Sequence, residues 1–427
     1  MKVLIVNMSD IMGGAGRAAY RLHRSLLASG IDSQMLVQQK DSDDFTVNGP
    51  ATKVNKIMGH LRPYIDTIPT RFYKDRAVAL FSPAWFGSSN ILKKIREIGP
   101  DIIHLHWICN GMIKIEALSK INIPIVWTLH DQWAFTGGCH YDEGCNGYKK
   151  KCGACPVLRS KKENDLSARG LSRKNKTFLG LKNVNVVGVS SWLANCAKES
   201  FVFRDNRITN LPNPIDTKIY KPINKHMARE LYNLPFDKKL ILFGAMGAVG
   251  DPRKGFKELS DALHVLNNKD VELVIFGSSE PPKPKNFGFK THYMGHVYDD
   301  ASLVALYSSV DVMIVPSLQE AFGQTASESM SCGTPVVAFA TTGLLDIVEH
   351  KKTGYLAQPF DVVDLKNGID WVLNSSNYEY LCKNARSKVV REFDGAVVAN
   401  KYIKLYKDVL NNPLSETIAP QQINTTI

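Results

Sequence analysis

Two glutamates eight positions apart are the residues whose type and spacing most directly suggest chemistry. Glu320 and Glu328 lie between two apolar runs, Asp311–Val315 and Pro335–Phe339, and a glycine-containing loop separates them. Carboxylates at the end of a buried strand and the start of the next helix face the crevice where open α/β sheets bind ligands. Their oxygens accept hydrogen bonds from sugar hydroxyls. The alternative is a pair of solvated acids stabilised by the helix dipole.

A glycine-rich turn, Gly13-Gly-Ala-Gly-Arg17, precedes a helix expected to run to about Ser29. Gly14, Gly16 and Ala19 match the dinucleotide-binding pattern G-x-G-x-x-A. A dinucleotide is disfavoured because the glycines begin six residues after the first apolar run, and because the second strand ends without an acid for a ribose hydroxyl. The turn still offers backbone N–H groups to a diphosphate or sugar, or serves only to pack helix on strand.

Apolar runs alternate with helical patterns along the chain, which predicts parallel sheets covered by helices on both faces. The strands expected in a first sheet are Lys2–Val6, Ser33–Val37, Ile102–Leu105, Ile123–Leu129 and Val184–Val189. Those expected in a second sheet are Lys239–Phe243, Val271–Phe276, Asp311–Val315 and Pro335–Phe339. The predicted fold class is α/β, with two Rossmann-like, doubly wound parallel-sheet domains and a cleft between them.

A chain of 427 residues exceeds what one core usually serves, so two domains are expected. Pro212 and Pro214 interrupt regular structure near the middle. We predict an N-terminal domain at 1–214 with a cysteine-rich insert at 137–156, and a C-terminal domain at 215–394. A helix at 395–411 is expected to pack back on the first domain. The tail at 412–427 has few large apolar residues and is predicted to be disordered.

The sequence has no run of about 18 apolar residues, so no membrane-spanning helix is expected. Residues Met1–Val6 combine one charge with a short apolar run, which we interpret as a first strand and not as a signal peptide. This interpretation predicts a cytoplasmic protein.

The net charge of +12 indicates an anionic partner: nucleotide, nucleic acid or acidic lipid. Lys149–Lys176 holds ten Lys or Arg, and Lys53–Arg76 holds six among apolar and aromatic residues. Such stretches can attach a protein peripherally to the inner face of the cytoplasmic membrane, or form a solvated basic face. No helix-turn-helix, zinc-finger or RNA-binding pattern stands out, so nucleic acid is not expected as a partner.

Half of the eight cysteines fall within seventeen positions: Cys139, Cys145, Cys152 and Cys155. In a reducing compartment disulfides are disfavoured, and four close thiols are typical of a structural zinc site. Two disulfides or four unligated thiols are the alternatives. A cross-link of either kind would hold a loop that follows directly on His130 at the rim of the cleft. The other cysteines are scattered and expected to be packed.

Together these motifs resemble the family-four (group 1) retaining glycosyltransferases of GT-B fold. The resemblance rests on the glycine turn at Gly13–Arg17, on Pro-Asn-Pro-Ile-Asp at 212–216, and above all on Glu320-x7-Glu328 followed by Gly333-Thr-Pro-Val-Val337. The run Val126–Trp133 with its following cysteines resembles enzymes of colanic acid and other exopolysaccharide assembly. One departure is that the family's usual Gly-Arg site falls at Ala245 or Met246.

The resemblance implies roles for the second domain, which would bind the nucleotide sugar. Glu320 would hold hydroxyls of the donor sugar, and Glu328 the ribose hydroxyls. Lys254 and Arg253 would stabilise charge on the departing diphosphate, although two exposed loop charges are the alternative. Backbone N–H groups at the helix start would add phosphate contacts. These belong to Phe322, Gly323, Gln324 and Thr325.

The first domain would take the acceptor. The resemblance places Gly14 and Gly16 at the donor and His130 beside the transferred sugar, whereas a structural hydrogen bond is the alternative for a histidine next to Asp131. His104 and His106 are expected on opposite faces of a strand, in structural roles. Because the leaving phosphate takes the acceptor's proton in retaining members, no residue is assigned as nucleophile.

The predicted function is hexose transfer from a nucleotide-diphosphate sugar to a saccharide or polyprenyl-diphosphate-linked acceptor, in surface polysaccharide biosynthesis. No cofactor is expected for catalysis. The cysteine-rich insert and the basic run after it are expected to shape the acceptor site. The alternatives are a nucleotide-sugar 2-epimerase of the same fold and a non-catalytic scaffold protein.

Overall fold

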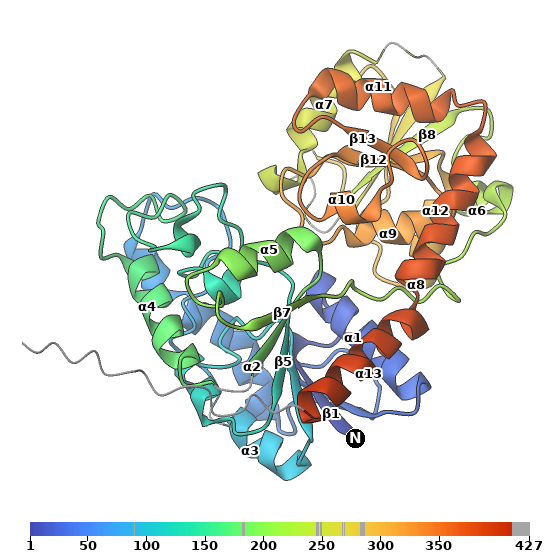
Figure 1. The fold of residues 1–427 in the computed structure, drawn as a ribbon. Coiled ribbons are helices and arrows are strands. Elements are labelled where there is room, and N and C mark those ends of the chain that lie inside the picture. Colours follow the sequence, from blue (N-terminus) through green and yellow to red (C-terminus); the bar gives the residue numbers. More distant parts are fainter. Residues whose placement is uncertain are drawn as a thin grey trace, which may run out of the picture.

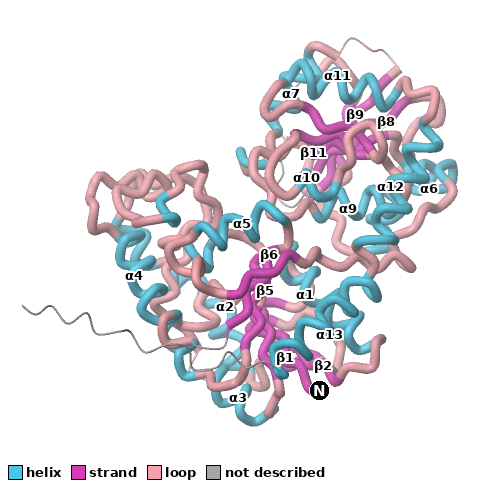
Figure 2. The backbone as a smooth tube through the Cα atoms, in the orientation of Figure 1, coloured by secondary structure: helices cyan, strands magenta, loops and turns pink. Residues whose placement is uncertain are grey.

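The computed structural model describes residues 1–88, 90–181, 184–244, 247, 250–266, 268, 270–281 and 287–411. In these residues the chain forms two parallel sheets, one in each half, with helices around them (Figure 1). Figure 2 shows the sheets as separate layers at some distance from each other. The predicted fold class is confirmed. The expected tail at 412–427 lies outside the described residues.

The first sheet has seven strands in the order β3-β2-β1-β4-β5-β6-β7. They are β1 (Lys2–Ser9), β2 (Asp32–Gln39), β3 (Val47–Asn48), β4 (Ile102–Leu105), β5 (Ile125–Leu129), β6 (Val184–Gly188) and β7 (Arg207–Asn210). The second has six strands in the order β10-β9-β8-β11-β12-β13. They are β8 (Lys239–Gly244), β9 (Val271–Phe276), β10 (Thr291–Tyr293), β11 (Val312–Val315), β12 (Val336–Phe339) and β13 (Gly354–Ala357). The order reverses between β1 and β4 and between β8 and β11, where such sheets bind ligands.

Helices connect successive strands. In the first half they are α1 (Gly13–Ala28), α2 (Lys53–Asp66), α3 (Asn90–Ile98), α4 (Leu166–Phe178) and α5 (Ser191–Glu199). In the second half they are α6 (Lys225–Leu231), α7 (Phe256–His264), α8 (Asp300–Ser309), α9 (Gln324–Ser331), α10 (Leu344–Ile347), α11 (Val362–Leu373), α12 (Tyr378–Glu392) and α13 (Gly395–Asn411). Short 3₁₀ helices are η1 (Ile68–Phe72), η2 (Ile115–Lys120), η3 (Trp133–Phe135), η4 (Gly147–Lys149) and η5 (Pro252–Lys254). None of the described helices is long and apolar enough to cross a membrane.

The nine expected strands are all present, and the four that sequence patterns missed are the outermost strands of the two sheets: β3, β7, β10 and β13. Central strands such as β4 and β9 are buried along their whole length. Residues of β7 and β10 are mostly exposed or half-buried. An outer strand is covered on fewer sides, so its sequence lacks the continuous apolar run that identifies a central strand.

The chain passes between the two halves at two adjacent segments. Ile215 and Asp394 form a parallel bridge, and the Ile215 N–H donates to the Phe393 carbonyl oxygen at 2.8 Å. Beyond this point α13 lies against α1 on the first sheet (Figure 1). Val398 and Tyr402 of α13 share a buried cluster with Val3 and Leu22, so the last described helix completes the core of the first half.

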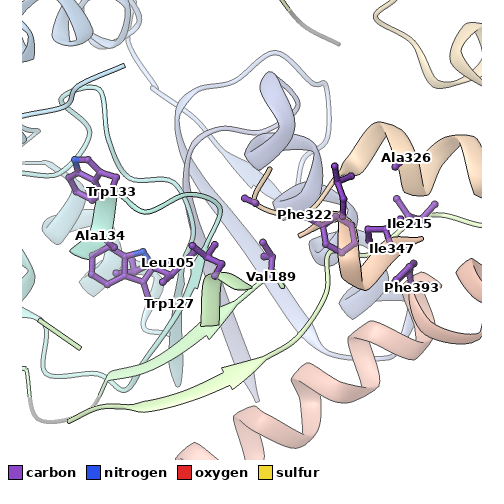
Figure 3. Close-up of a cluster of buried hydrophobic side chains, with 14 of the residues drawn as sticks. Leu105, Trp127, Trp133, Ala134, Val189, Ile215, Phe322, Ala326, Ile347 and Phe393 are labelled. Carbon is purple, nitrogen blue, oxygen red and sulfur yellow. The ribbon is translucent and has the colours of Figure 1, made fainter. Parts of the chain in front are cut away.

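One buried apolar cluster continues from the first half into the second. Leu105 and Trp127 belong to the first sheet, and Val189 lies between them and the residues of the second half (Figure 3). There Phe322 packs edge-on against Phe393, with ring centroids 5.5 Å apart. Apolar contact therefore holds the halves together beneath the ligand-binding edges of both sheets.

Candidate active site

A cavity of about 890 Å³ lies between the two halves, where strands of both sheets end. Every residue predicted for catalysis or donor binding lines it. These residues are Gly14, Gly16, His130, Arg253, Lys254, Glu320, Phe322, Gly323, Gln324, Thr325 and Glu328. The structure thus brings together side chains that lie up to about three hundred positions apart in the sequence. Their individual roles stay predictions.

Glu320 and Lys254 form a largely buried ion pair within the second half. The Lys254 ammonium donates to a Glu320 carboxylate oxygen at 2.6 Å, and the Ser317 hydroxyl donates to the same oxygen at 3.3 Å. The exposed fractions of the two paired side chains are 13% and 18%. Burial acts to raise the pKa of Glu320, but Lys254 and Arg253 together hold that pKa below its ordinary value. Glu320 is therefore ionised at neutral pH.

A tight turn after β8 positions Lys254. Gly255 has a φ of 72°, and a Cβ added there would lie 1.8 Å from the Pro316 carbonyl oxygen. Only glycine lets this turn approach the end of β11 so closely. Lys254, the last residue of η5, is thereby brought to the carboxylate that follows β11.

Arg253 supports the loop that carries Glu320. Its guanidinium donates to the Gln319 carbonyl oxygen and to the Asp251 carboxylate, both at 2.8 Å. It also lies over the Tyr141 ring, 4.1 Å from the centroid. Tyr141 belongs to the first half, in the cysteine-rich insert, and sequence patterns gave no sign of this contact. Arg253 thus connects the loop that carries Glu320 to the cysteine-rich insert.

The start of α9 faces the glycine turn of α1. Gly323 precedes α9 with a φ of 99°, and Phe322 points its ring into the core, so only its backbone is available to the cavity. In the orientation of the Gln324 amide that satisfies its neighbours, its nitrogen donates to the Gly14 carbonyl oxygen at 3.0 Å and its oxygen accepts from Arg21 at 3.1 Å. A Cβ on Gly14 would approach the Gln324 side chain to 3.3 Å. The helix start and the glycine turn therefore contact each other at the cavity. Backbone N–H groups at the start of a helix can bind an anion.

Glu328 is held from the opposite half of the molecule. Arg21 of α1 lies 2.8 Å from one carboxylate oxygen, and the Tyr307 hydroxyl donates to the other at 2.9 Å. The exposed fractions of Arg21 and Glu328 are only 8% and 5%. Burial acts to lower the pKa of Arg21, but the Glu328 carboxylate raises it, so the guanidinium stays charged. A carboxylate oxygen can accept two hydrogen bonds, and each oxygen of Glu328 has one of these partners, so each can accept a further donor.

Arg21 also belongs to a wider contact between α1 and the second half. It lies over the Tyr220 ring, 4.8 Å from the centroid, while the Tyr220 hydroxyl donates to Asp300 at 2.7 Å. Arg17, one helical turn earlier, donates to the same Asp300 carboxylate at 3.0 Å. Sequence analysis missed both arginines. Their spacing of four residues, which places them on one helix face beside the glycine turn, was the available signal.

His130 follows β5 directly and makes its hydrogen bond with another histidine. Its Nε2 lies 2.8 Å from Nδ1 of His106, and the rings stack with centroids 5.1 Å apart. Burial lowers the pKa of His130 to about 4, so the ring is neutral at pH 7. Asp131 does not bond His130. It accepts from Trp107 at 2.8 Å and bonds His140 at 2.6 Å.

The expectation that His104 and His106 face opposite ways was wrong. Their ring centroids lie 4.2 Å apart, because residues two positions apart share one face of a strand. His104 bonds the Tyr406 hydroxyl and Thr128, both at 2.7 Å, as a structural residue should. His106 differs, since it contacts a cavity residue and its buried Nε2 has no hydrogen-bond partner among the described residues.

The cysteine-rich insert contains free thiols. Cys139, Cys152 and Cys155 are buried and Cys145 is exposed, and none forms a disulfide. In the part of the chain that the structure describes, no group of three or more histidine, cysteine or acidic side chains is arranged to hold a metal ion. Zinc at these thiols stays a prediction, without support from this arrangement. Burial raises the pKa of Cys139, which favours the neutral thiol of a packed residue.

Part of the basic run after the insert serves internal contacts. Lys174 is buried and donates to the Thr136 carbonyl oxygen at 3.0 Å, and burial lowers its pKa to about 8. Arg173 bonds Glu116 at 2.6 Å, and Lys149 pairs with Glu199 at 2.8 Å. Lys150, Lys161 and Lys162 remain exposed. The positions of the family's usual Gly-Arg site, Ala245 and Met246, lie outside the described residues.

Two family models match this chain on either side of its midpoint. Residues 12–219 match the description "Glycosyltransferase Family 4", and residues 229–388 match "Glycosyl transferases group 1". The chain belongs to the family-four, group 1 glycosyltransferases. The Glu320–Glu328 pair and Lys254 fall in the second match, and the glycine turn and His130 in the first. As a glycosyltransferase of GT-B fold, the protein is a transferase.

Named relatives of this glycosyltransferase act in glycan assembly. WcaC of Escherichia coli, a candidate glycosyl transferase of colanic acid biosynthesis, is 22% identical over 86% of this chain and 89% of its own. The N,N′-diacetylbacillosaminyl-diphospho-undecaprenol α-1,3-N-acetylgalactosaminyltransferase of Campylobacter jejuni is 28% identical. That match covers 43% of this chain and 49% of the relative.

A solved structure shares the fold of this glycosyltransferase. HepE of Anabaena, solved in complex with UDP-glucose, superposes with a TM-score of 0.63 at 16% identity. The alignment covers 96% of this chain and 100% of HepE. At this identity the likeness supports the fold.

Proposed function

We propose that this glycosyltransferase moves a hexose from a nucleotide-diphosphate sugar to a lipid-linked saccharide, with retention of anomeric configuration, in surface polysaccharide assembly. The observation that carries the proposal is the cavity between the halves, in which a buried carboxylate–ammonium pair lies beside two helix starts. Cations and helix N-termini suit a diphosphate, and carboxylate oxygens suit sugar hydroxyls.

The proposed reaction breaks the bond between the anomeric carbon and the diphosphate oxygen. The acceptor hydroxyl oxygen forms the new bond on the same face of the sugar, and its proton goes to the departing diphosphate. Lys254 and Arg253 stabilise the negative charge that develops there. Glu320 orients the sugar, and Glu328, held by Arg21, takes the ribose. No residue is required as a nucleophile.

A neutral His130 fits the same proposal. Because its pKa is about 4, the ring offers a hydrogen bond to the sugar without adding positive charge that would compete with Lys254 for the diphosphate. The lipid-linked acceptor is supported by the Campylobacter relative, and the nucleotide sugar by HepE and its UDP-glucose.

The test is an assay of the full-length protein with a panel of UDP- and GDP-sugars and a polyprenyl-diphosphate saccharide. Released nucleoside diphosphate together with a lengthened saccharide supports the proposal, and NMR of the product's anomeric proton reports retention. An epimerised donor without transfer would replace the proposal with a nucleotide-sugar 2-epimerase. No turnover and no binding of any donor would leave a non-catalytic scaffold.

A further inference from the structure

Helix α2 exposes several large apolar side chains, which an ordinary surface helix turns toward the core. Its two fully buried residues are Gly59 and Asp66. Four large apolar side chains of α2 are exposed, with exposed fractions of 68% for Val54, 59% for Ile57, 46% for Leu61 and 67% for Tyr64. Single exposed apolar residues are ordinary, but a run of them on one element marks a binding surface.

These apolar residues form one stripe. Spacings of three and four residues place side chains on the same face of a helix. Past the end of α2, where the chain continues as the 3₁₀ helix η1, two more large apolar side chains are exposed, Ile68 at 41% and Phe72 at 85%. We call the exposed apolar residues Val54, Ile57, Leu61, Tyr64, Ile68 and Phe72 the α2–η1 face.

Polar contacts on the inner side prevent α2 from rolling its stripe into the protein. The Asp66 carboxylate accepts from the Ala84 N–H at 3.3 Å, and the Trp85 indole donates to the Asp66 carbonyl oxygen at 2.9 Å. A Cβ on Gly59 would lie 2.9 Å from the Gln38 carbonyl oxygen, so the helix rests closely on β2. The outward direction of the stripe is therefore set by the fold.

Along the chain segment that forms the α2–η1 face, the exposed charges are mostly positive, and outside it the exposed Asp41 lies near His60 of α2. Lys53, Lys56, Arg71 and Lys74 are exposed, and from Lys53 to Asp75 the one exposed acid is Asp75. Apolar side chains flanked by cations match the interface of an anionic bilayer, which accepts the former among its acyl chains and attracts the latter. A second copy of this chain fits poorly, since a two-fold contact would oppose like charges.

We propose that the α2–η1 face binds the surface of an anionic lipid bilayer. Eight residues after Phe72 the chain reaches Leu80, which lines the central cavity, so the face and one side of the cavity belong to neighbouring segments of the first half. Docking there holds the enzyme at the membrane that contains a lipid-linked acceptor. This consequence rests on the proposed function, whereas the docking itself does not.

The test is co-sedimentation of the full-length protein with vesicles of phosphatidylglycerol and phosphatidylcholine, and with vesicles of phosphatidylcholine alone. One variant combines Ile57→Ser, Tyr64→Ser and Phe72→Ser, and a second combines Lys53→Glu, Lys56→Glu and Lys74→Glu. A control variant carries Leu231→Ser, Val363→Ser and Tyr380→Ser, residues of the second half with exposed fractions of 69%, 60% and 62%. Circular dichroism melting checks that all variants fold.

We expect the wild type and the control to bind anionic vesicles and to bind phosphatidylcholine weakly. Both α2–η1 variants should lose about tenfold or more in partition, and added salt should weaken wild-type binding. Folded variants that bind as the wild type does would overturn the proposal. So would a lipid-free dimer, seen by light scattering, that the serine variant converts to a monomer.

Activity separates this proposal from the proposed function. The serine variant should transfer sugar to a water-soluble acceptor at the wild-type rate but use a vesicle-embedded acceptor poorly. Vesicle binding without turnover of any donor would refute the proposed function and leave the docking face in place. Turnover on vesicles that the serine variant leaves unchanged would refute the docking face alone.

Discussion

The strand ends on the two sides of the cavity differ in charge: one side carries an ion pair, and the other carries two neutral histidines. On the wall from the second sheet, Glu320 and Lys254 form an ion pair at 2.6 Å. On the wall from the first sheet, His130 and His106 share a hydrogen bond at 2.8 Å, and burial lowers the pKa of both so that they are neutral. Each wall ends a buried parallel strand, so the difference arises from what lies behind the strand end and not from the strand itself.

Behind the second wall, glycine turns bring cations to the carboxylates, and the opposite charges stabilise each other. Behind the first wall, the ring of His106 stacks on His130, and His104 lies beyond it. Burial lowers the pKa of His130 more than the neighbouring Asp131 carboxylate raises it. In the proposed function, Lys254 on the charged wall meets the diphosphate, and Glu320 and His130 meet the sugar from opposite walls. Two charges of the first half cross to the second: the buried Arg21 pairs with Glu328, and the more exposed Arg17 pairs with Asp300.

Removing the buried crossing charge should have the largest effect. Arg21→Met leaves the Glu328 carboxylate buried without its cation, so we expect the free energy of unfolding to fall by about 3 kcal/mol or more, with a higher KM for the donor. Arg17→Met is the control, because its partner Asp300 is 40% exposed, and should cost about 1 kcal/mol or less. Urea unfolding measures both, and equal losses would contradict the bridging role of Arg21.

The charged wall is tested next by Glu320→Ala. Loss of the carboxylate misplaces the sugar and frees Lys254, so kcat should fall about 100-fold. Ser317→Ala removes a donor to the same oxygen and should lower kcat far less. Steady-state kinetics with the best donor decides, and a Glu320→Ala enzyme as active as the wild type would remove Glu320 from the site.

The neutral wall should make the protein sensitive to mild acid. His130 has a folded pKa of about 4 against 6.5 when unfolded, so the unfolded chain takes the proton first. Its contribution is fully present above pH 6.5 and is lost as pH falls, by about 2 kcal/mol at pH 5. His104 and His23, with pKa values lowered by burial to about 3 and 4, act in the same direction.

Because the pKa of Glu320 lies below its ordinary value in the folded protein, its contribution to stability is lost only at pH values below this range. Unfolding free energies measured between pH 7.5 and 5 should therefore fall for the wild type and fall less for His130→Asn. A wild-type stability that is flat over this range would mean that the first wall is not neutral.

The smallest expected effect concerns the His106–His130 hydrogen bond. The unpartnered Nε2 of His106 favours the tautomer with the proton on Nδ1, which donates to His130, because a buried unpaired N–H is costly. His106→Asn keeps a donor near that place and should retain activity, whereas His106→Leu should lower kcat about tenfold. Equal activity of the two variants would show that the bond does not orient His130.

Sequence patterns predicted the central strands, the cleft and every cavity residue that the family motif contains. They missed four outer strands, β3, β7, β10 and β13. Residues of β7 and β10 are half-buried or exposed, β3 has only two residues, and β13 is half-buried in its middle, so none carries a continuous buried apolar run. They also missed Tyr141 and Tyr307, since a tyrosine in a loop or in an apolar helix looks the same in the sequence whether or not it faces a ligand. The prediction that His106 faces away from His104 was wrong, because residues two positions apart in a strand share one face.

The sequence by itself determined the parallel-sheet fold and the Glu320–Lys254 side of the site, because these depend on local features: apolar runs, glycine turns, and acids at strand ends. Only the tertiary structure decided that Glu328 pairs with Arg21, that His130 is neutral, and that α2 turns its apolar stripe outward. Each of these depends on which elements pack against each other. A partner some three hundred positions away, or the burial of a ring, is set by contacts that no local pattern contains.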